Sequence, residues 1–255
     1  LEVGGVATET VVEDTHTAMR LHAAGWRSVY HHEVLAVGLA PEEVGAFLTQ
    51  RGRWARGCFQ MLRRDNPLRA RGLSWRQRLH YFASVSHYLE GPQRLVGLLI
   101  PPITLATGVL PLAASQYTYL ALFIPQLVLV PMATWAMAEG RYRFFEGERF
   151  ALVRVIAYTR AASALLLRRP VRFAVTPKGA DSRGGSAVRA LLPQLAIAGL
   201  ALGGAAYQTV AQVLDLPGRL SPFAYAVTVA WALIGAGLLG WMSLWAGGVR
   251  HRRRA

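Results

Sequence analysis

Cysteine and lysine are almost absent from this sequence, and each shortage limits what the chain can do. Cys58 is the only cysteine among 255 residues, so an internal disulfide framework and a thiolate metal cluster are both excluded. We expect Cys58 to be a passive helix residue. Lys178 is the only lysine among 28 basic residues, and the formal net charge of +14 therefore comes almost entirely from arginine.

Charged residues are absent from three long stretches, which cover residues 95–138, 190–214 and 220–249. A membrane-spanning helix needs about 20 apolar residues, so the first stretch can hold two spans and each of the others one. Nucleic-acid binding is the other standard interpretation of so basic a chain, but the charge-free stretches argue against it. Together with a hydrophobic content of 53%, they predict four transmembrane helices.

The basic residues are distributed unevenly around these four predicted spans. The connection at residues 115–117 has none, and the connection between the last two spans has only Arg219. All others lie in the amino-terminal part, in the central segment of residues 139–189 or in the tail of residues 250–255. By the positive-inside rule, these three parts are expected on the cytoplasmic side of the membrane.

Outside the predicted spans, the patterns indicate a soluble part and two surface helices. Residues 1–40 resemble the tail of a soluble domain, with an amphipathic helix ended by Gly25 and a strand-like run at residues 26–31. Because the chain has neither an initiator methionine nor a signal peptide, we expect it to begin inside that domain. Residues 63–94 and 139–189 are basic segments with the apolar patterning of interfacial helices. The apolar stripe of the second segment consists of Phe150, Val153, Ala157, Ala161 and Ala164.

A helical stretch near residue 50 carries side chains that suit a sugar chain beside a diphosphate. Gln50, Arg53 and Trp54 have the spacing that places them on one helix face. An indole can stack on a pyranose ring, and a guanidinium can pair bidentately with phosphoryl oxygens. An ordinary amphipathic helix with a core tryptophan explains these residues equally well. Asp14 also has two possible interpretations, as a functional carboxylate or as an ordinary helix N-cap.

Three motifs taken together resemble the catalytic subunit of bacterial cellulose synthase, a processive and inverting family 2 glycosyltransferase. The first is the segment of residues 9–30 with its Glu13-Asp14 pair, and the second is Gln50-x-x-Arg53-Trp54. The third lies between the second and third predicted spans, and it reads Phe-Ala-Val-Thr-Pro-Lys-Gly at residues 173–179. It is similar to the family's F-x-V-T-x-K gating loop, which closes over the nucleotide sugar. This loop points to a β-glucan synthase within the family.

The resemblance implies a role for each matched residue. Asp14 would be the general base, which an inverting single displacement needs, and Glu13 stands beside it. Val12 replaces the threonine of the family's Thr-Glu-Asp motif, which weakens the match at that position. Trp54 and Gln50 would bind the acceptor end of the glucan, and Arg53 and Arg51 would contact the nucleotide diphosphate. The lid of the gating loop would consist of Phe173, Val175, Thr176 and Lys178.

The resemblance also implies a fold and a set of partners. The expected fold is an α-helical polytopic bundle, with interfacial helices, attached to the C-terminal fragment of an α/β GT-A domain. Expected partners are UDP-glucose or another UDP-sugar, the growing β-glucan chain, the lipid bilayer and an accessory periplasmic subunit, without nucleic acid. The predicted parts are residues 1–62 (glycosyltransferase fragment), 63–94 (interfacial), 95–138 (two spans), 139–189 (interfacial helix and gating loop), 190–249 (two spans) and 250–255 (basic tail).

No metal ligand is assigned in this chain. The sequence contains no Asp-x-Asp motif, so the Mg²⁺ or Mn²⁺ expected for the intact enzyme would take its ligands from outside these residues. The chain alone is therefore expected to be inactive. The histidines lack the paired spacing of a metal site and are expected to be packing or surface residues. They include His16, His22, His31 and His32.

Three alternative functions remain open at this point. Two use the same site, namely the synthesis of another β-linked exopolysaccharide and a non-processive family 2 glycosylation of a lipid. The third belongs to another class, a polytopic transporter with an accidental match to the motifs. A transporter needs binding residues inside its spans, and the predicted spans contain no charged residue.

Overall fold

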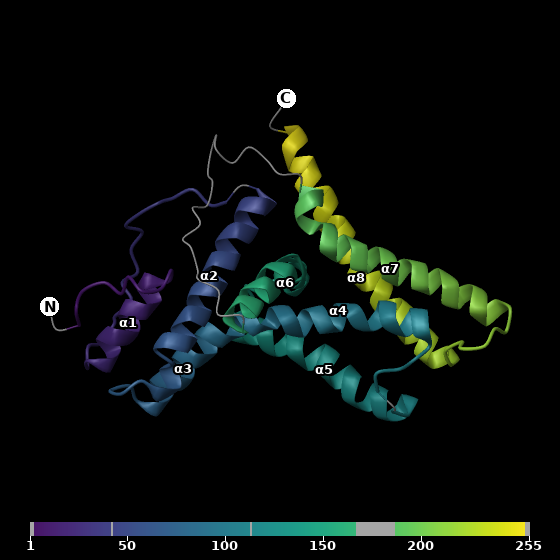
Figure 1. Ribbon diagram of the computed structural model, residues 1–255, viewed down its shortest axis with the longest axis horizontal. Coiled ribbons are helices and arrows are strands. Elements are labelled where there is room, and N and C mark those ends of the chain that lie inside the picture. The colour runs from purple at the N-terminus through teal and green to yellow at the C-terminus, as the bar shows by residue number, and fades with distance from the viewer. Residues whose placement is uncertain (1–2, 42, 113, 167–186, 253–255) are drawn as a thin grey trace. The chain divides into compact units, whose positions relative to one another are not determined.

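The computed structural model describes residues 3–41, 43–112, 114–166 and 187–252. These residues are mostly helical and contain no β-strand, so the α/β character expected for the amino-terminal part stays a prediction. The chain divides into two compact units (Figure 1). The first combines Leu1–Gln93 with Arg154–Ser186, and the second combines Arg94–Val153 with Ala187–Ala255.

The first unit is built on helix α2. Its elements in chain order are α1 (Glu13–Ala23), α2 (Val44–Arg64), the 3₁₀ turn η1 (Pro67–Arg69), α3 (Trp75–Ser86) and the 3₁₀ turn η2 (His87–Leu89). The predicted helix ended by Gly25 is confirmed, since α1 stops there and Gly25 has a φ of 92°. Ser74 begins α3 with a reciprocal capping box to Gln77.

Large apolar side chains from α2, α3 and the second half of α6 form the core of the first unit. The largest of them that are fully buried are Phe59, Met61, Val85 and Tyr158. Trp54 is only half-buried and packs against the edge of this core. The core therefore fixes the orientation of α2, the helix that carries the predicted acceptor-binding residues.

Gly57 lies where the segment just before α1 packs closely against α2. A methyl group at Gly57 would lie 2.6 Å from Cγ1 of Val12 and 2.9 Å from Cγ2 of Val11. Only a glycine leaves room for these two valines against the helix backbone. The segment that leads into Glu13 and Asp14 is thus seated directly on α2.

Residues 26–41 cross the surface of the first unit without helix or strand. The strand predicted at residues 26–31 is therefore absent from the structure. A strand requires a neighbouring strand for its N–H and C=O groups, and the described residues offer none. Apolar side chains of this segment are strongly exposed, including Val29 at 90% and Val37 at 93%.

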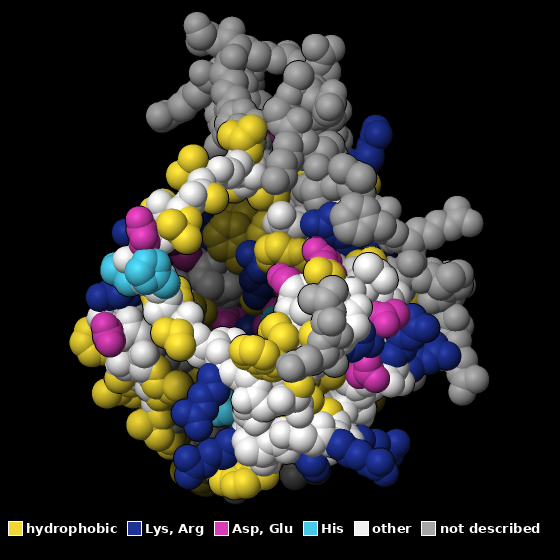
Figure 2. All heavy atoms as spheres, turned by 90° about the vertical axis from the view of Figure 1, so that its left-hand side faces the viewer, with side chains coloured by type: hydrophobic (Ala, Val, Ile, Leu, Met, Phe, Trp, Pro, Cys, Tyr) yellow, Lys and Arg dark blue, Asp and Glu magenta, His cyan; other side chains and the backbone are white. Residues whose placement is uncertain are grey.

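The segment from η1 into α3 combines exposed basic and apolar side chains. Trp75 is 67% exposed and Leu79 is 51% exposed, and Arg71 and Arg76 beside them also face solvent. Figure 2 shows Lys and Arg side chains next to hydrophobic ones at the lower edge of the face that it presents. This composition suits the interfacial helix predicted within residues 63–94, and contact with a membrane stays a prediction.

The second unit consists mainly of five long helices. They are α4 (Glu90–Thr107), α5 (Gln116–Met137), α6 (Phe144–Leu166), α7 (Ala187–Val213) and α8 (Pro222–Arg252). Two of these, α4 and α6, begin or end in the first unit. The connection between α4 and α5 is longer than predicted and covers residues 108–115, because Gly108 adopts a φ of 72° after α4 and Ser115 caps α5.

Three helices are long and apolar enough to cross a membrane, and they are Gln116–Met137, Val188–Val213 and Pro222–Leu244. These correspond to three of the four predicted spans. Helix α4 contains the remaining one, but its 18 residues include Glu90, Arg94 and two prolines. It is therefore not among the candidate spans, and the fourth span stays a prediction.

Helices α7 and α8 run alongside each other (Figure 1) and are joined by a short turn that two glutamines hold. Small residues at their contact, such as Ala201, Ala205 and Ala224, permit close packing. Gln208 is fully buried, and its Oε1 accepts a hydrogen bond from the backbone N–H of Leu220 at 3.2 Å. The Nε2 of Gln212 donates to the carbonyl oxygen of Leu220 at 2.6 Å.

The close approach at Gly57 predicts a specific effect of substitution. Gly57→Ala should destabilise the protein by about 1–3 kcal/mol, because the new methyl group overpacks Val11 and Val12. Gly45→Ala is the matched control on the same helix, since a Cβ there meets nothing within 4 Å. It should be neutral or stabilising by up to ~1 kcal/mol. Thermal unfolding of both variants in detergent tests this, and equal effects would contradict the packing.

The buried position of Cys58 predicts a slow thiol reaction. Burial raises the pKa of the Cys58 thiol to about 11, so little thiolate is present at neutral pH. A maleimide should label the folded protein at pH 7 at least tenfold more slowly than the same protein in denaturant, by our estimate from this thiolate fraction. Mass spectrometry of timed samples gives both rates, and fast labelling of the folded protein would show that the α2 core is open.

Candidate active site

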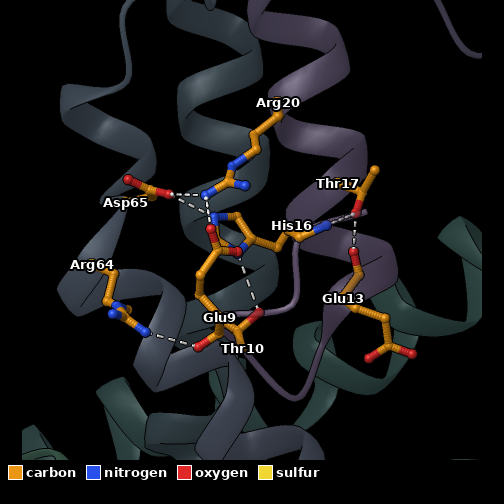
Figure 3. A network of polar contacts seen from close by, with 9 residues as sticks. Glu9, Thr10, Glu13, His16, Thr17, Arg20, Arg64 and Asp65 are labelled. Carbon is orange, nitrogen blue, oxygen red and sulfur yellow. Dashed lines mark hydrogen bonds and ion pairs between the residues drawn. The ribbon is translucent and has the colours of Figure 1, made fainter. Parts of the chain in front are cut away.

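A buried histidine lies where α1 meets the end of α2 (Figure 3). The Nε2 of His16 lies 2.7 Å from Oδ2 of Asp65, the residue that follows α2 directly. Its Nδ1 lies 3.2 Å from Oγ1 of Thr10, in the segment before α1. The imidazole has no exposed surface, so each ring nitrogen faces a protein partner.

Two arginines extend this network on its exposed side (Figure 3). The Nη2 of Arg20 donates to Oδ2 of Asp65 at 3.2 Å and to Oε1 of Glu9 at 3.1 Å. The Nη1 of Arg64 donates to the backbone carbonyl oxygen of Glu9 at 3.1 Å. The segment ahead of α1 is therefore tied to the last turn of α2 through both side-chain and backbone groups.

Further hydrogen bonds fix the backbone just before the carboxylate pair. The N–H of Val11 donates to Oε1 of Gln60 on α2 at 3.2 Å. The N–H of Ala7 donates to Oγ1 of Thr17 on α1 at 2.9 Å. Val12 itself is the N-cap residue of α1 and makes no side-chain capping bond. The N-cap interpretation of Asp14 is therefore not supported, since Asp14 is the second residue inside the helix.

Glu13 and Asp14 both face solvent in the first turn of α1. Oδ1 of Asp14 accepts a hydrogen bond from the backbone N–H of Thr15 at 2.7 Å, and in Figure 3 the Glu13 side chain points away from the buried network. Negative charge is favourable at this end of a helix. The Asp14 carboxylate is thus accessible from solution.

On α2, Trp54 and Arg53 lie about one turn before the Gly57 contact, and Gln50 lies about two turns before it. Trp54 precedes Gly57 by three residues and Arg53 by four, which corresponds to about 5 Å along the axis. The Cζ of Arg51 lies 4.8 Å from the centre of the Trp54 ring and 5.2 Å from that of Phe47. The structure therefore packs the segment that leads into Glu13 and Asp14 on the helix that carries the Gln50-x-x-Arg53-Trp54 motif, and it places the Arg51 guanidinium over the Trp54 indole.

Sequence reasoning missed the role of His16, Arg20 and Asp65, and it treated His16 as an ordinary packing residue. His16 and Asp65 are 49 positions apart, so no local pattern signals their pairing. Among the described residues, no group of three His, Cys, Asp or Glu side chains could hold a metal ion. The gating-loop residues lie outside the described ranges, and they are Phe173, Val175, Thr176 and Lys178.

The second unit contains a cavity of about 690 Å³ between its helices. Apolar side chains form most of its wall, and Thr104, Thr228 and the Arg94–Glu148 ion pair contribute polar groups. In that pair, Nη1 of Arg94 lies 2.7 Å from Oε2 of Glu148. Two aromatic residues of the wall, Tyr119 and Trp231, are linked by a hydrogen bond of 3.3 Å from the indole N–H.

Comparison with known proteins gives consistent matches. The sequence model described as glycosyl transferase family group 2 matches residues 1–138. Cellulose synthase 2 of Novacetimonas hansenii is 40% identical over 181 residues, which is 70% of this chain and 11% of that protein. The cellulose synthase catalytic subunit (UDP-forming) of Pseudomonas fluorescens is 42% identical over 143 residues, which is 56% of this chain and 19% of that protein.

A third relative matches most of the chain. Cellulose synthase 1 catalytic subunit (UDP-forming) of Komagataeibacter xylinus is 34% identical over 239 residues, covering 91% of this chain and 32% of that protein. The chain therefore spans between 11% and 32% of the length of these three curated relatives. The resemblance deduced from the three motifs is confirmed by these matches.

The Asp65 carboxylate predicts an acid-sensitive contact between α1 and α2. Hydrogen bonds from His16 and then Arg20 hold the pKa of Asp65 below the ordinary value of about 3.9. Because the pKa is lowered in the folded state, this stabilisation is present above about pH 4 and is lost as the pH falls below it. Asp65→Asn should lower the melting temperature at pH 6 and flatten its further decline towards pH 3. Parallel declines in the two proteins would contradict the assignment.

Proposed function

Because the chain belongs to the glycosyl transferase family group 2, we propose that it forms the acceptor-side wall of a transferase that extends a β-glucan from UDP-glucose. The observation that carries the proposal is the packing of Val11 and Val12, which lead into Glu13 and Asp14, on Gly57 of α2, one turn from Trp54. It ties the segment that carries a solvent-facing carboxylate to the helix that carries Trp54 and the two arginines. The rest of the transferase site would come from parts of a full-length synthase that this chain does not cover.

In this proposal, Asp14 is the general base of a single displacement. Its carboxylate takes the proton of an acceptor hydroxyl while that oxygen bonds to the anomeric carbon of the donor. The bond between the anomeric carbon and the diphosphate oxygen breaks at the same time, and UDP leaves. Solvent exposure of Asp14 suits this role, because the acceptor must reach the carboxylate. Glu13 stands beside it, and we assign no step to it.

The acceptor would bind on the α2 face formed by Gln50 and Trp54. Arg51 covers the Trp54 ring at 4.8 Å, and such a cation–π contact is worth only ~0.5–1 kcal/mol near a surface. A sugar ring can therefore displace the guanidinium, which is then available to the diphosphate together with Arg53. The lid that closes over the nucleotide is assigned to Phe173, Val175, Thr176 and Lys178 of the gating loop.

A divalent ion belongs to the proposal for the full-length enzyme only. Mg²⁺ or Mn²⁺ would stabilise the departing diphosphate, yet the described residues contain no group of three side chains suited to hold it. We therefore derive no step through the metal from this chain.

The glucan would leave through the second unit. Its cavity of about 690 Å³ falls in the size range of ligand sites and offers Tyr119 and Trp231 as flat surfaces for sugar rings. Tyr119 belongs to the cavity wall, whereas Tyr117 and Trp135 do not. Three helices of the length and composition of membrane spans support transfer across a bacterial inner membrane, with a fourth span at α4. The transferase part, the gating loop and the C-terminus would be cytoplasmic.

Other sugars and acceptors would use the same site. Another β-linked polymer or a glycosylated lipid requires the same base and the same α2 face, so assays with single UDP-sugars distinguish these products. No observation favours the transporter alternative. An accessory periplasmic subunit stays an expectation from the resemblance.

The assignment of Asp14 predicts a severe loss of activity in one variant. In a full-length synthase that carries these residues, Asp14→Asn should lower polymer formation at least 100-fold, because general-base catalysis contributes about 10²–10⁴-fold. Asp215→Asn makes the same chemical change in the exposed turn between α7 and α8, and it should leave activity unchanged. Incorporation of labelled glucose by membranes measures both, with insertion checked by membrane fractionation. Wild-type activity in Asp14→Asn would refute the assignment of Asp14 as the general base.

A further inference from the structure

The proposed function leaves His16 without a role, although it is one of the few fully buried polar residues in the first unit. Burying an imidazole is unfavourable unless its nitrogens find partners. Here the carboxylate of Asp65 can only accept, so Nε2–H of His16 donates to it at 2.7 Å. The other nitrogen faces the hydroxyl of Thr10 at 3.2 Å. One ring thus joins the segment before α1, α1 itself and the end of α2.

The position of His16 in α1 relates it directly to Asp14. The two residues are two positions apart, which is about 200° around an α-helix. When the His16 ring is held inside against Asp65, Asp14 must lie on the opposite, solvent-facing side of α1. Val12 precedes His16 by four residues and so shares its buried face, where it rests on Gly57. Together the two contacts fix both the distance and the rotation of α1 relative to α2.

Helix α1 depends on such contacts for its orientation. It has only 11 residues and no side-chain cap at its start, and helices of this length are marginal by themselves. A rotation of α1 by a fraction of a turn would turn the Asp14 carboxylate away from its solvent-facing position. In enzymes, a shift of about 1 Å in a reacting group can cost about 100-fold in rate.

We propose that His16 is a positioning residue for glycosyl transfer, which acts through Asp65 to hold α1 at one rotation and so keeps the Asp14 carboxylate on the solvent-facing side of α1. The inference rests on the proposed function and deepens it. His16 contacts neither substrate in this account, and its effect is on the chemical step rather than on donor binding. Arg20 supports it from the exposed side by bonding to the same oxygen of Asp65.

The chain offers a matched control for His16. His22 lies on the same helix and also bonds two partners, Oη of Tyr81 at 2.7 Å and Oγ of Ser28 at 2.8 Å. It sits near the end of α1, one and a half turns beyond His16 and away from the carboxylate pair. His22→Ala therefore removes the hydrogen bonds of a histidine on α1 without removing the contact that positions Asp14.

In a full-length synthase in membranes, His16→Ala should lower kcat by ~10–100-fold and leave KM for UDP-glucose within about twofold. His22→Ala should keep kcat within about twofold. Rates are expressed per inserted synthase, quantified by immunoblotting of washed membranes. An unchanged kcat in His16→Ala overturns the proposal, as does an equal loss of kcat in His22→Ala or a rise in KM without a fall in kcat.

A pair of amide variants keeps the test decisive if His16→Ala does not fold. His16→Gln places a donor near the former Nε2 and can still bond to Asp65, whereas His16→Asn places its amide near the former Nδ1 and reaches only towards Thr10. Gln should recover at least a third of the wild-type kcat, and Asn should not. Equal activities of the two amides overturn the role of Asp65.

The failure of this inference is distinguishable from the failure of the proposed function. An inactive Asp14→Asn enzyme beside a fully active His16→Ala enzyme refutes only the positioning role. An active Asp14→Asn enzyme refutes the base itself, and the positioning role falls with it.

Discussion

The contact of Val12 with Gly57 is the constraint on which the arrangement of the first unit depends. It brings the start of a short helix against the middle of a long one, within van der Waals distance of the α2 backbone. The segment that leads into Glu13 and Asp14 is thereby packed on the helix that carries the second motif. The hydrogen bonds of His16, Gln60 and Arg64 then act around this contact. The packing contact sets the distance between α1 and α2, and the hydrogen bonds set the rotation of α1.

Much of the helical fold could be predicted from the sequence, because its signals are local. Gly25 ends α1 through its φ, and the absence of charge marks α5, α7 and α8. The His16–Asp65 pair could not be predicted, since its partners meet only after α1 folds back on α2. The strand-like run at residues 26–31 carried a real local preference, but strand formation depends on a partner that the described residues do not provide.

The candidate site, too, was predictable from the sequence only in part. The exposed carboxylates and the α2 face were deduced from motifs, whose residue types suit the chemistry. The contact of the Arg51 guanidinium with the Trp54 ring was not deduced from the sequence, because residue spacing alone cannot say which of two neighbouring arginines covers an indole. In the second unit, Tyr117 and Tyr119 are equally plausible from a uniformly apolar sequence. Only the packing of α5 against its neighbours places Tyr119 in the cavity wall and leaves Tyr117 76% exposed.

The glutamines that hold the turn after α7 have a consequence for how the chain enters a bilayer. Gln208 and Gln212 satisfy both backbone groups of Leu220 from within the same helix pair. A polar turn that must pass through hydrocarbon is less costly when its N–H and C=O groups are already bonded. Helices α7 and α8 are therefore suited to insert together as one preformed hairpin, rather than as two spans that find each other afterwards.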